Sequence, residues 1–251
     1  VTTGGYNTLI GYHAGLAMTN ADGNIAIGHE SLGTNTLADR NVAIGYRALV
    51  TMDIASKGDV GNTAVGWNSG TAVTTGIKNT FLGLEAGKGL TSGSNNTSIG
   101  SLAGQSHATG SHCTNLGSGA QPSSNTTSGQ FTLGDGNVSN LRCNDQSISA
   151  LSDSRDKTDV IDSPYGLDFI NTVRPVQFKW ETRDGNVKDG STRLGFLAQE
   201  LLTACDGNNA VLNLVLEENP NKLEASYGNL LTPLVKAVQE LSATVTTLQQ
   251  E

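Results

Sequence analysis

Hydrophobic and polar positions recur at a fixed interval through the first half of the chain. The pattern is an asparagine, two residues, a branched apolar residue and a glycine; it occurs six times before a weaker seventh copy that begins at Cys113. The glycines that end the copies are residues 11, 28, 45, 66, 83, 100 and 117. They are 17 residues apart except for one interval of 21, which carries an insertion around Met52–Asp59. Flexible glycine-rich linkers keep no such register, so we predict an ordered repeat.

A period of this length suits one turn of a parallel β-solenoid and is too short for a helix pair or a propeller blade. We expect two short strands in each turn, with the apolar residue before each glycine stacked on its equivalents in the neighbouring turns. The glycine allows a positive φ or a close backbone approach at a corner. The asparagine can form a side-chain ladder or bond the backbone of its own turn.

Small residues lie three positions after the first six glycines. They are Ala14, Ser31, Ala48, Ser69, Ala86 and Ala103. We expect them to pack closely between neighbouring chains at a shared axis, because a solenoid with such small turns buries little surface alone. Over about Thr8–Ala120 the pattern resembles the head repeats of trimeric autotransporter adhesins, which form left-handed β-rolls in trimers, although the period here differs. The resemblance implies a homotrimer.

A second periodic pattern of apolar residues lies at the end of the chain. Apolar residues are spaced 3, 4, 3, 4 and 3 positions apart, namely Leu231, Leu234, Val238, Leu241, Val245 and Leu248. This is the a/d pattern of about three heptads. It predicts a trimerising coiled-coil helix over residues 229–251. The alternative is an amphipathic helix that packs on its own domain.

The composition changes near residue 150. Of the 31 glycines, 25 lie before residue 151, whereas most of the charged residues follow it. A domain boundary is therefore expected there. Just beyond it, Leu151 to Val160 form a charged stretch that is typical of a helix start, with Ser152 or Asp153 as the N-cap.

Four landmarks follow one another from Ala150 to the C-terminus. They are Ser152-Asp153-x-Arg155-x-Lys157, then Val173-Arg174-Pro175-Val176-x-Phe178-x-Trp180, then Leu194-Gly195-Phe196-Leu197-Ala198-Gln199-Glu200, and finally Tyr227-x-x-Leu230 leading into Leu234-Val235-Lys236-Ala237-Val238-x-Glu240-Leu241. In this order they resemble the C-terminal chaperone family of endosialidase tailspikes and phage tail fibres. The resemblance implies a trimerisation chaperone that cuts itself off, with Ser152 as nucleophile, Lys157 as general base and Leu151–Ser152 as the scissile bond.

The residue types suit this chemistry. A serine hydroxyl needs a base to become a nucleophile, and a lysine can be that base when burial leaves it neutral. Five positions along an α-helix place two side chains about 140° apart around the axis. The segment is therefore expected to be a turn or loop when active, or the pair forms between subunits. Ser152 attacks either the carbonyl just before it or a neighbouring chain; the sequence does not choose.

We therefore predict a mainly β trimeric fibre of parallel β-solenoid (β-roll) repeats, followed by an α/β chaperone domain that ends in a triple-stranded coiled coil. In the α/β module we expect a helix and strand within Phe169–Trp180, a turn marked by Asp184-Gly185 and Asp189-Gly190, and a strand that becomes a helix over Gly195–Ala204. The predicted regions are the fibre at 1–120, a β-rich connector at 121–151, the chaperone and autoprotease domain at 152–228, and the trimerising helix at 229–251.

Charge and composition exclude several functions. The net charge of −8 argues against nucleic-acid binding, and no apolar stretch has the length of a membrane span. The four histidines and three cysteines offer no convergent ligand set, so we expect no metal and no cofactor, and we take His107 and His112 as solvated or trimer-facing side chains.

The chain begins at Val1 rather than Met, so we expect a fragment of a longer protein. The predicted function is that of a bacteriophage tail fibre or spike, located in the virion, which binds an unidentified host cell-surface receptor through its fibre. The alternative is a non-cleaving trimeric surface adhesin with a structural C-terminal cap.

Overall fold

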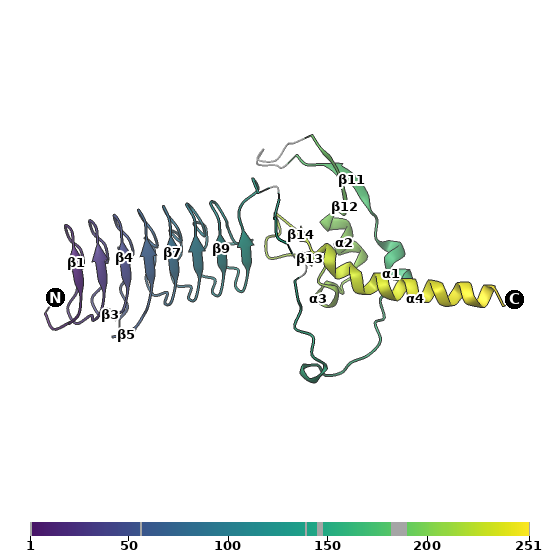
Figure 1. Cartoon of the computed structure of the whole chain (residues 1–251), viewed down its shortest axis with the longest axis horizontal. Coiled ribbons are helices and arrows are strands. Elements are labelled where there is room, and N and C mark those ends of the chain that lie inside the picture. The colour runs from purple at the N-terminus through teal and green to yellow at the C-terminus, as the bar shows by residue number, and fades with distance from the viewer. Residues whose placement is uncertain (1, 56, 139, 145–147, 182–189, 251) are drawn as a thin grey trace. The chain divides into compact units, whose positions relative to one another are not determined.

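The structure is a computed structural model that describes residues 2–55, 57–138, 140–144, 148–181 and 190–250. The chain divides into two compact units, Val1–Val138 and Ser139–Glu251 (Figure 1). Each unit is described by itself.

The first unit is a parallel β-solenoid of about seven turns, as the repeat predicts. Its main sheet contains eight strands of three residues, each paired in parallel with the equivalent strand of the next turn (Figure 1). In chain order they are β1 (Thr8–Ile10), β2 (Ile25–Ile27), β4 (Val42–Ile44), β6 (Thr63–Val65), β7 (Thr80–Leu82), β8 (Thr97–Ile99), β9 (Thr114–Leu116) and β10 (Phe131–Leu133). The sheet thus extends past residue 120 into the segment expected to be a connector.

The described turns each contribute one strand to this sheet, rather than the two strands expected. A second sheet pairs only β3 (Ala38–Asp39) with β5 (Gly58–Asp59), at the insertion. Here Lys57 forms an ion pair with Asp22 at 2.6 Å, so the extra residues tie back to an earlier turn.

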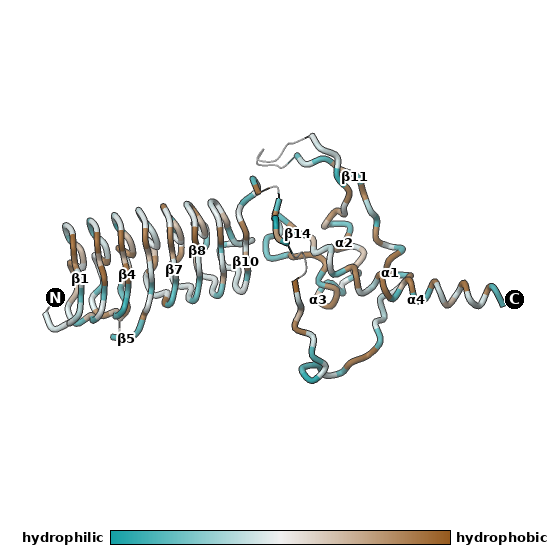
Figure 2. The backbone as a smooth tube through the Cα atoms, in the orientation of Figure 1, coloured by the Kyte–Doolittle hydropathy of each residue, from teal (hydrophilic) through white to brown (hydrophobic). Residues whose placement is uncertain are grey.

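The middle residue of each strand points into the solenoid, and the two flanking residues point outward. Ala26, Ala43 and Phe81 are buried, whereas Ile10 and Leu82 are 57% and 47% exposed. The apolar residue before each glycine does stack in register, from Ile10 on Ile27 through to Leu133 on Leu116. Figure 2 shows hydrophobic residues recurring at the strand in successive turns. This apolar ladder lies on the outer face of the sheet.

The small residues after the glycines are inside the chain, and the expectation that they pack between chains is wrong. Ser31, Ala48, Ser69 and Ala86 are fully buried within the single solenoid. Because these side chains are enclosed by their own chain, a larger side chain would have no room in the core. His107 is also buried there rather than solvated or trimer-facing, with its Nε2 atom 3.0 Å from the Thr127 carbonyl. Burial lowers its pKa.

A buried asparagine ladder runs along the solenoid. In each step the amide Oδ1 of one asparagine accepts a hydrogen bond from the backbone N–H of its equivalent in the next turn, at 2.9–3.0 Å. The asparagines are Asn7, Asn24, Asn41, Asn62, Asn79 and Asn96, and Cys113 takes the next position. The Asn79 Nδ2 atom also donates to the Gly93 carbonyl at 2.9 Å. Side chains therefore satisfy backbone groups where the chain enters each strand of the sheet.

A second column, which the sequence interpretation missed, bonds another corner in the same way. The Asp22 and Asp39 carboxylates accept from the backbone N–H of the preceding turn, each at 2.7 Å. Farther along, Ser94 and Ser111 hydroxyls take the same role at 3.1 and 3.0 Å.

The corner glycines are required by both conformation and space. Gly66 has a φ of +139°, and a Cβ on it would lie 2.3 Å from the Gly83 carbonyl oxygen in the next turn. No side chain fits a contact of that length, so the turns stack at this corner only as glycine on glycine.

The second unit is a small α/β domain. After a short 3₁₀ turn (Ser154–Asp156) its elements are α1 (Leu167–Thr172), β11 (Val176–Lys179), β12 (Thr192–Gly195), α2 (Ala198–Ala204), α3 (Asn209–Leu212), β13 (Val215–Leu216), β14 (Glu224–Ala225), a 3₁₀ turn (Tyr227–Leu230) and α4 (Leu231–Leu248). The predicted helix and strand are α1 and β11, and the predicted strand-to-helix segment is β12 and α2. Strands β11 and β12 pair antiparallel. The predicted turn at Asp184-Gly185 and Asp189 lies outside the described residues.

A compact core joins the elements of this unit. Leu201, Cys205, Leu212, Leu214 and Val215 are buried together, and partly buried side chains from α1 pack against them. Burial raises the pKa of the Cys205 thiol.

Helix α4 packs on α1. Gly166, the N-cap of α1, brings no side-chain hydrogen bond. Instead the Glu240 carboxylate of α4 accepts from the Leu167 N–H at 2.7 Å, so one helix supplies the cap of the other.

Replacing Gly66 by alanine should strongly destabilise the solenoid, because the new Cβ would clash with the Gly83 backbone. We expect a loss of at least about 3 kcal/mol in the free energy of unfolding. Gly61 is the matched control: it also has a positive φ, of +61°, but a Cβ there meets nothing within 4 Å. Gly61→Ala should cost only about 1 kcal/mol. Urea unfolding measures both, and equal losses would contradict the stacking argument.

Replacing Asn79 by alanine should interrupt the ladder. The change leaves the Asn96 N–H and the Gly93 carbonyl without these buried partners. Each unsatisfied group costs about 1–3 kcal/mol, so for two groups we expect a total of about 2–6 kcal/mol. The exposed Ser92→Ala change serves as control and should stay within about 0.5 kcal/mol of the parent. Thermal unfolding followed by circular dichroism compares the two; a midpoint for Asn79→Ala equal to that of the control would refute a stabilising ladder.

Candidate functional site

The predicted cleavage site lies on an exposed segment at the start of the second unit. Residues 148–162 are all exposed. Large apolar side chains are among them: Ile148 is 97% exposed and Leu151 is fully exposed. Val160 and Ile161 are also largely exposed. A single chain therefore presents the Leu151–Ser152 bond in water, with apolar residues on both sides of it.

A capped turn shapes the backbone directly after this bond. Asp153 is the N-cap of the 3₁₀ turn Ser154–Asp156, and its Oδ1 atom accepts from the Arg155 N–H at 2.9 Å. The turn ends at Lys157, which is extended and donates its N–H to the Ser154 carbonyl. Of the two predicted N-cap residues, Ser152 and Asp153, it is Asp153 that caps the turn in the structure.

This turn brings the two predicted catalytic side chains together. The Lys157 Nζ atom donates to the Ser152 Oγ atom at 2.6 Å. An α-helix would have placed the two side chains on different faces, and the observed turn avoids that. Both residues belong to one chain, so the pair forms without a partner subunit. A lysine that bonds a serine hydroxyl directly is suitably placed to take its proton.

The environment of the pair decides whether that transfer can occur. A lysine acts as a base only without its proton, and removal from water favours that form. Ser152 and Lys157 are both exposed, so the single chain does not withdraw them from water. The geometry of a dyad is present, whereas its burial is not.

Asp153 and Arg155 form an ion pair beside the dyad. The Arg155 guanidinium contacts both carboxylate oxygens of Asp153, with Nε to Oδ1 at 3.0 Å and Nη2 to Oδ2 at 2.6 Å. Hydrogen bonds from the Arg155 side chain and then from its N–H lower the pKa of Asp153. The carboxylate is therefore ionised at neutral pH, and only acid below the normal range of an aspartate would protonate it. The residue pattern had assigned neither residue a role.

The remaining landmarks contact one another in the fold. Arg174 forms an ion pair with Glu200, which joins the second landmark to the third. The Tyr227 hydroxyl donates to the Phe196 carbonyl at 3.0 Å and accepts from the Phe196 N–H at 3.2 Å, which joins the third to the fourth. The four landmarks thus describe a connected domain plus the exposed turn that precedes it.

The predicted a/d seam lies on the exposed side of α4. Its six residues, Leu231, Leu234, Val238, Leu241, Val245 and Leu248, are between 46% and 66% exposed. The buried residues of α4 are Pro233 and Ala237, which lie with Glu240 on a neighbouring face, about 100° around the helix axis from the seam. The helix therefore packs on its own domain through a face other than the seam, and the seam has no cover in the single chain.

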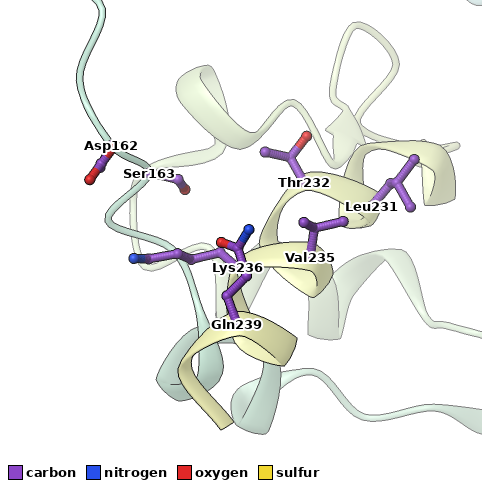
Figure 3. Close-up of a pocket in the computed structure, with 7 residues that line it drawn as sticks. All are labelled: Asp162, Ser163, Leu231, Thr232, Val235, Lys236 and Gln239. Carbon is purple, nitrogen blue, oxygen red and sulfur yellow. The ribbon is translucent and has the colours of Figure 1, made fainter. Parts of the chain in front are cut away.

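Two hollows of the second unit lie at the base of α4. One, of about 400 Å³, is lined by Asp162, Ser163, Leu231, Thr232, Val235, Lys236 and Gln239 (Figure 3). In Figure 3 Asp162 and Ser163 lie on the segment that faces the helix, and Lys236 extends toward them. A larger neighbour of about 690 Å³ continues toward Val211 and Asn229. Neither is lined by Ser152 or Lys157, so these hollows are not substrate pockets of the dyad.

The described part of the chain offers neither a metal centre nor a membrane-spanning helix. It contains no group of three or more His, Cys, Asp or Glu side chains arranged to hold a metal ion. None of its helices has the length and apolar character needed to cross a membrane.

Comparison with known proteins identifies one region. No curated protein and no solved structure matches the chain significantly. A family model, described as chaperone of endosialidase, matches residues 152–212. The match starts at Ser152, the residue of the dyad that follows the predicted scissile bond, and spans the first three landmarks. Residues 152–212 are therefore similar to the chaperone-of-endosialidase family, and their position after a β-solenoid fits a tail fibre with a C-terminal chaperone domain.

Proposed function

We propose that this chain is the C-terminal part of a bacteriophage tail fibre or spike whose last domain trimerises the fibre and then releases itself by cutting Leu151–Ser152. The observation that carries the proposal is the 2.6 Å contact between Lys157 Nζ and Ser152 Oγ at the first residue of the chaperone-family match. As a virion component, the fibre would bind a host cell-surface receptor.

The proposed reaction needs only residues of the exposed turn and water. Lys157 takes the proton of the Ser152 hydroxyl, and the Oγ atom attacks the carbonyl carbon of a Leu151 residue. The peptide bond then breaks, the nitrogen leaves with a proton, and an ester joins the two parts. Water hydrolyses the ester, giving a carboxylate at Leu151 and a free amino group at Ser152. The balance is the same whether the attacked carbonyl belongs to the same chain or to a neighbour.

Assembly with other chains would remove the Ser152–Lys157 pair from water, which the single chain does not do. The exposed side chains of Ile148, Leu151, Val160 and Ile161 flank the dyad in the sequence and favour contact with another apolar surface. Covering them would also remove water from Lys157, which favours its neutral form. The cut would therefore follow trimerisation rather than precede it.

Two unpartnered apolar surfaces support a homotrimer. One is the α4 seam, and the other is the outward apolar ladder of the solenoid sheet, from Ile10 to Leu133. The ladder repeats once per turn along the whole sheet, and a second copy of the same solenoid has a matching repeat. A surface of this length is more than isolated exposed apolar residues account for.

The self-cleavage proposal is tested with Ser152→Ala and Lys157→Ala in the full chain. Each change removes one half of the dyad, so we expect the 152–251 fragment to appear by mass spectrometry in the wild type and in neither variant. Ser154→Ala and Lys222→Ala are controls with exposed side chains of the same types, and they should cut at the wild-type rate. A wild-type chain that forms trimers yet stays intact would refute the cut and favour the alternative of a non-cleaving adhesin with a structural cap.

The role of the seam is tested by placing a charge on it. Leu241→Lys should shift the chain from trimer to monomer in light scattering, because a buried lysine at a d position has no partner. Ala243→Lys places the same charge on the exposed side of α4 away from the seam and should leave the trimer intact. If the two variants assemble equally, the seam does not join the chains. Leu241→Lys should also slow the cut, since cleavage is proposed to depend on assembly.

A further inference from the structure

We propose that Asp153 and Arg155 are positioning residues of the self-cleavage reaction: their paired side chains close the turn that places the Lys157 amine on the Ser152 hydroxyl. The inference rests on the proposed function, and it gives a role to two residues of the first landmark that the sequence left without one.

The first step of the argument is how little else holds the turn. The 3₁₀ turn Ser154–Asp156 contains no buried residue, and residues 148–162 are exposed throughout. A turn of three residues has poor hydrogen-bond geometry and little stability by itself in water. The approach of Lys157 to Ser152 therefore depends on the local bonds within the segment rather than on packing.

The second step is the cap. Ser152 and Lys157 flank the turn on its two sides, and their side chains meet only when it is closed. At its start the Asp153 Oδ1 atom accepts the Arg155 N–H at 2.9 Å, while the Asp156 N–H reaches the Asp153 carbonyl at 3.2 Å. At its end the Lys157 N–H donates to the Ser154 carbonyl at 3.3 Å. Asp153 is thus the one side chain that bonds the turn backbone in this set.

The third step is the role of Arg155. Its guanidinium meets both carboxylate oxygens of Asp153 in a two-point contact. An ion pair this exposed adds little to stability. The main effect of the ion pair is geometric. The guanidinium fixes the plane of the Asp153 carboxylate, so that Oδ1 stays directed at the Arg155 N–H. Asp153 caps the turn, and Arg155 orients the cap.

Single-turnover cleavage of the full chain tests this. Asp153→Ala removes the cap and should slow release of the 152–251 fragment about tenfold, because a smaller fraction of turns is closed. Asp153→Asn keeps an oxygen that can cap and should stay within about threefold of wild type. Arg155→Ala should fall between them. Asp156→Ala is the control, an exposed acid in the same turn whose side chain is not the cap.

A positioning role also predicts what stays constant. In Asp153→Ala the midpoint of the pH–rate profile should remain that of the wild type while the rate falls at every pH; a shifted midpoint would mean that the Asp153 charge acts on the lysine directly and would overturn the inference. Trimer content and thermal midpoint should be unchanged, because the turn contributes no buried residue to the core of the described chain. A tenfold loss confined to variants that no longer assemble would equally overturn it.

The remaining outcomes distinguish a failure of the positioning role from a failure of the proposed function on which it rests. If wild type cuts, Ser152→Ala does not, and Asp153→Ala cuts at the wild-type rate, the positioning role is wrong and the dyad stands. If Asp156→Ala slows the cut as much as Asp153→Ala, the cap is not the cause. If Ser152→Ala still releases the fragment, or trimeric wild type never does, the proposed function fails and the inference falls with it.

Discussion

The solenoid depends on one constraint, which is that every turn satisfies backbone groups of its neighbour. An asparagine Oδ1 atom accepts the N–H of the next turn, and a corner aspartate or serine accepts the N–H of the preceding one. The strands of the main sheet pair with equivalent strands 17 or 21 residues away. A single turn closes none of these bonds within itself. The array is therefore stable only when turns stack in register, as in other repeat proteins.

The same constraint limits what residues can occupy the corner and the interior. Glycine must follow glycine where the turns meet, since the Gly66 corner leaves no space for a Cβ. Inside, alanine is the most frequent buried residue, and a few larger side chains such as Leu49, Met52 and Phe81 fill the space between the alanines. Such a core buries little apolar area per turn, while the outer face of the sheet keeps a continuous apolar ladder. A solenoid built this way gains from covering that ladder with further chains.

The repeat determines how much of this fold can be predicted from the sequence. It identifies equivalent residues, so the turn register, the asparagine ladder and the corner glycines could all be inferred. It does not say which side of the backbone a side chain takes. The small residues such as Ala48 were therefore expected between chains, whereas they lie in the core of one chain. The corner column changes from Asp22 and Asp39 to Ser94 and Ser111, and this change of residue type hid it.

The candidate site, too, was predictable from the sequence only in part. The family resemblance indicated Ser152 and Lys157, and the helical angle left a turn, a loop or a pair between subunits as alternatives. Of these the structure has a turn within one chain. The means of closing it could not be read from the pattern, because an aspartate two residues before an arginine usually means solvated charge. The two faces of α4 were equally hidden: the heptad marked the seam, whereas the Glu240 cap on α1 depends on a contact across 73 positions.

Parallel strands whose partners lie a full turn away form slowly and expose unpaired edges while they form. A domain that gathers three chains before the strands pair would set their register, and it is no longer needed once the ladder faces are covered. Its removal would leave a fibre that cannot unfold by the route along which it folded, which is kinetic stability. For that order to hold, the cut must wait for assembly. A Ser–Lys pair that is aligned locally by a capped turn, and that a neighbouring chain shields from water, would meet that requirement. The alignment would be ready early, and the base would become effective only when the chains have met.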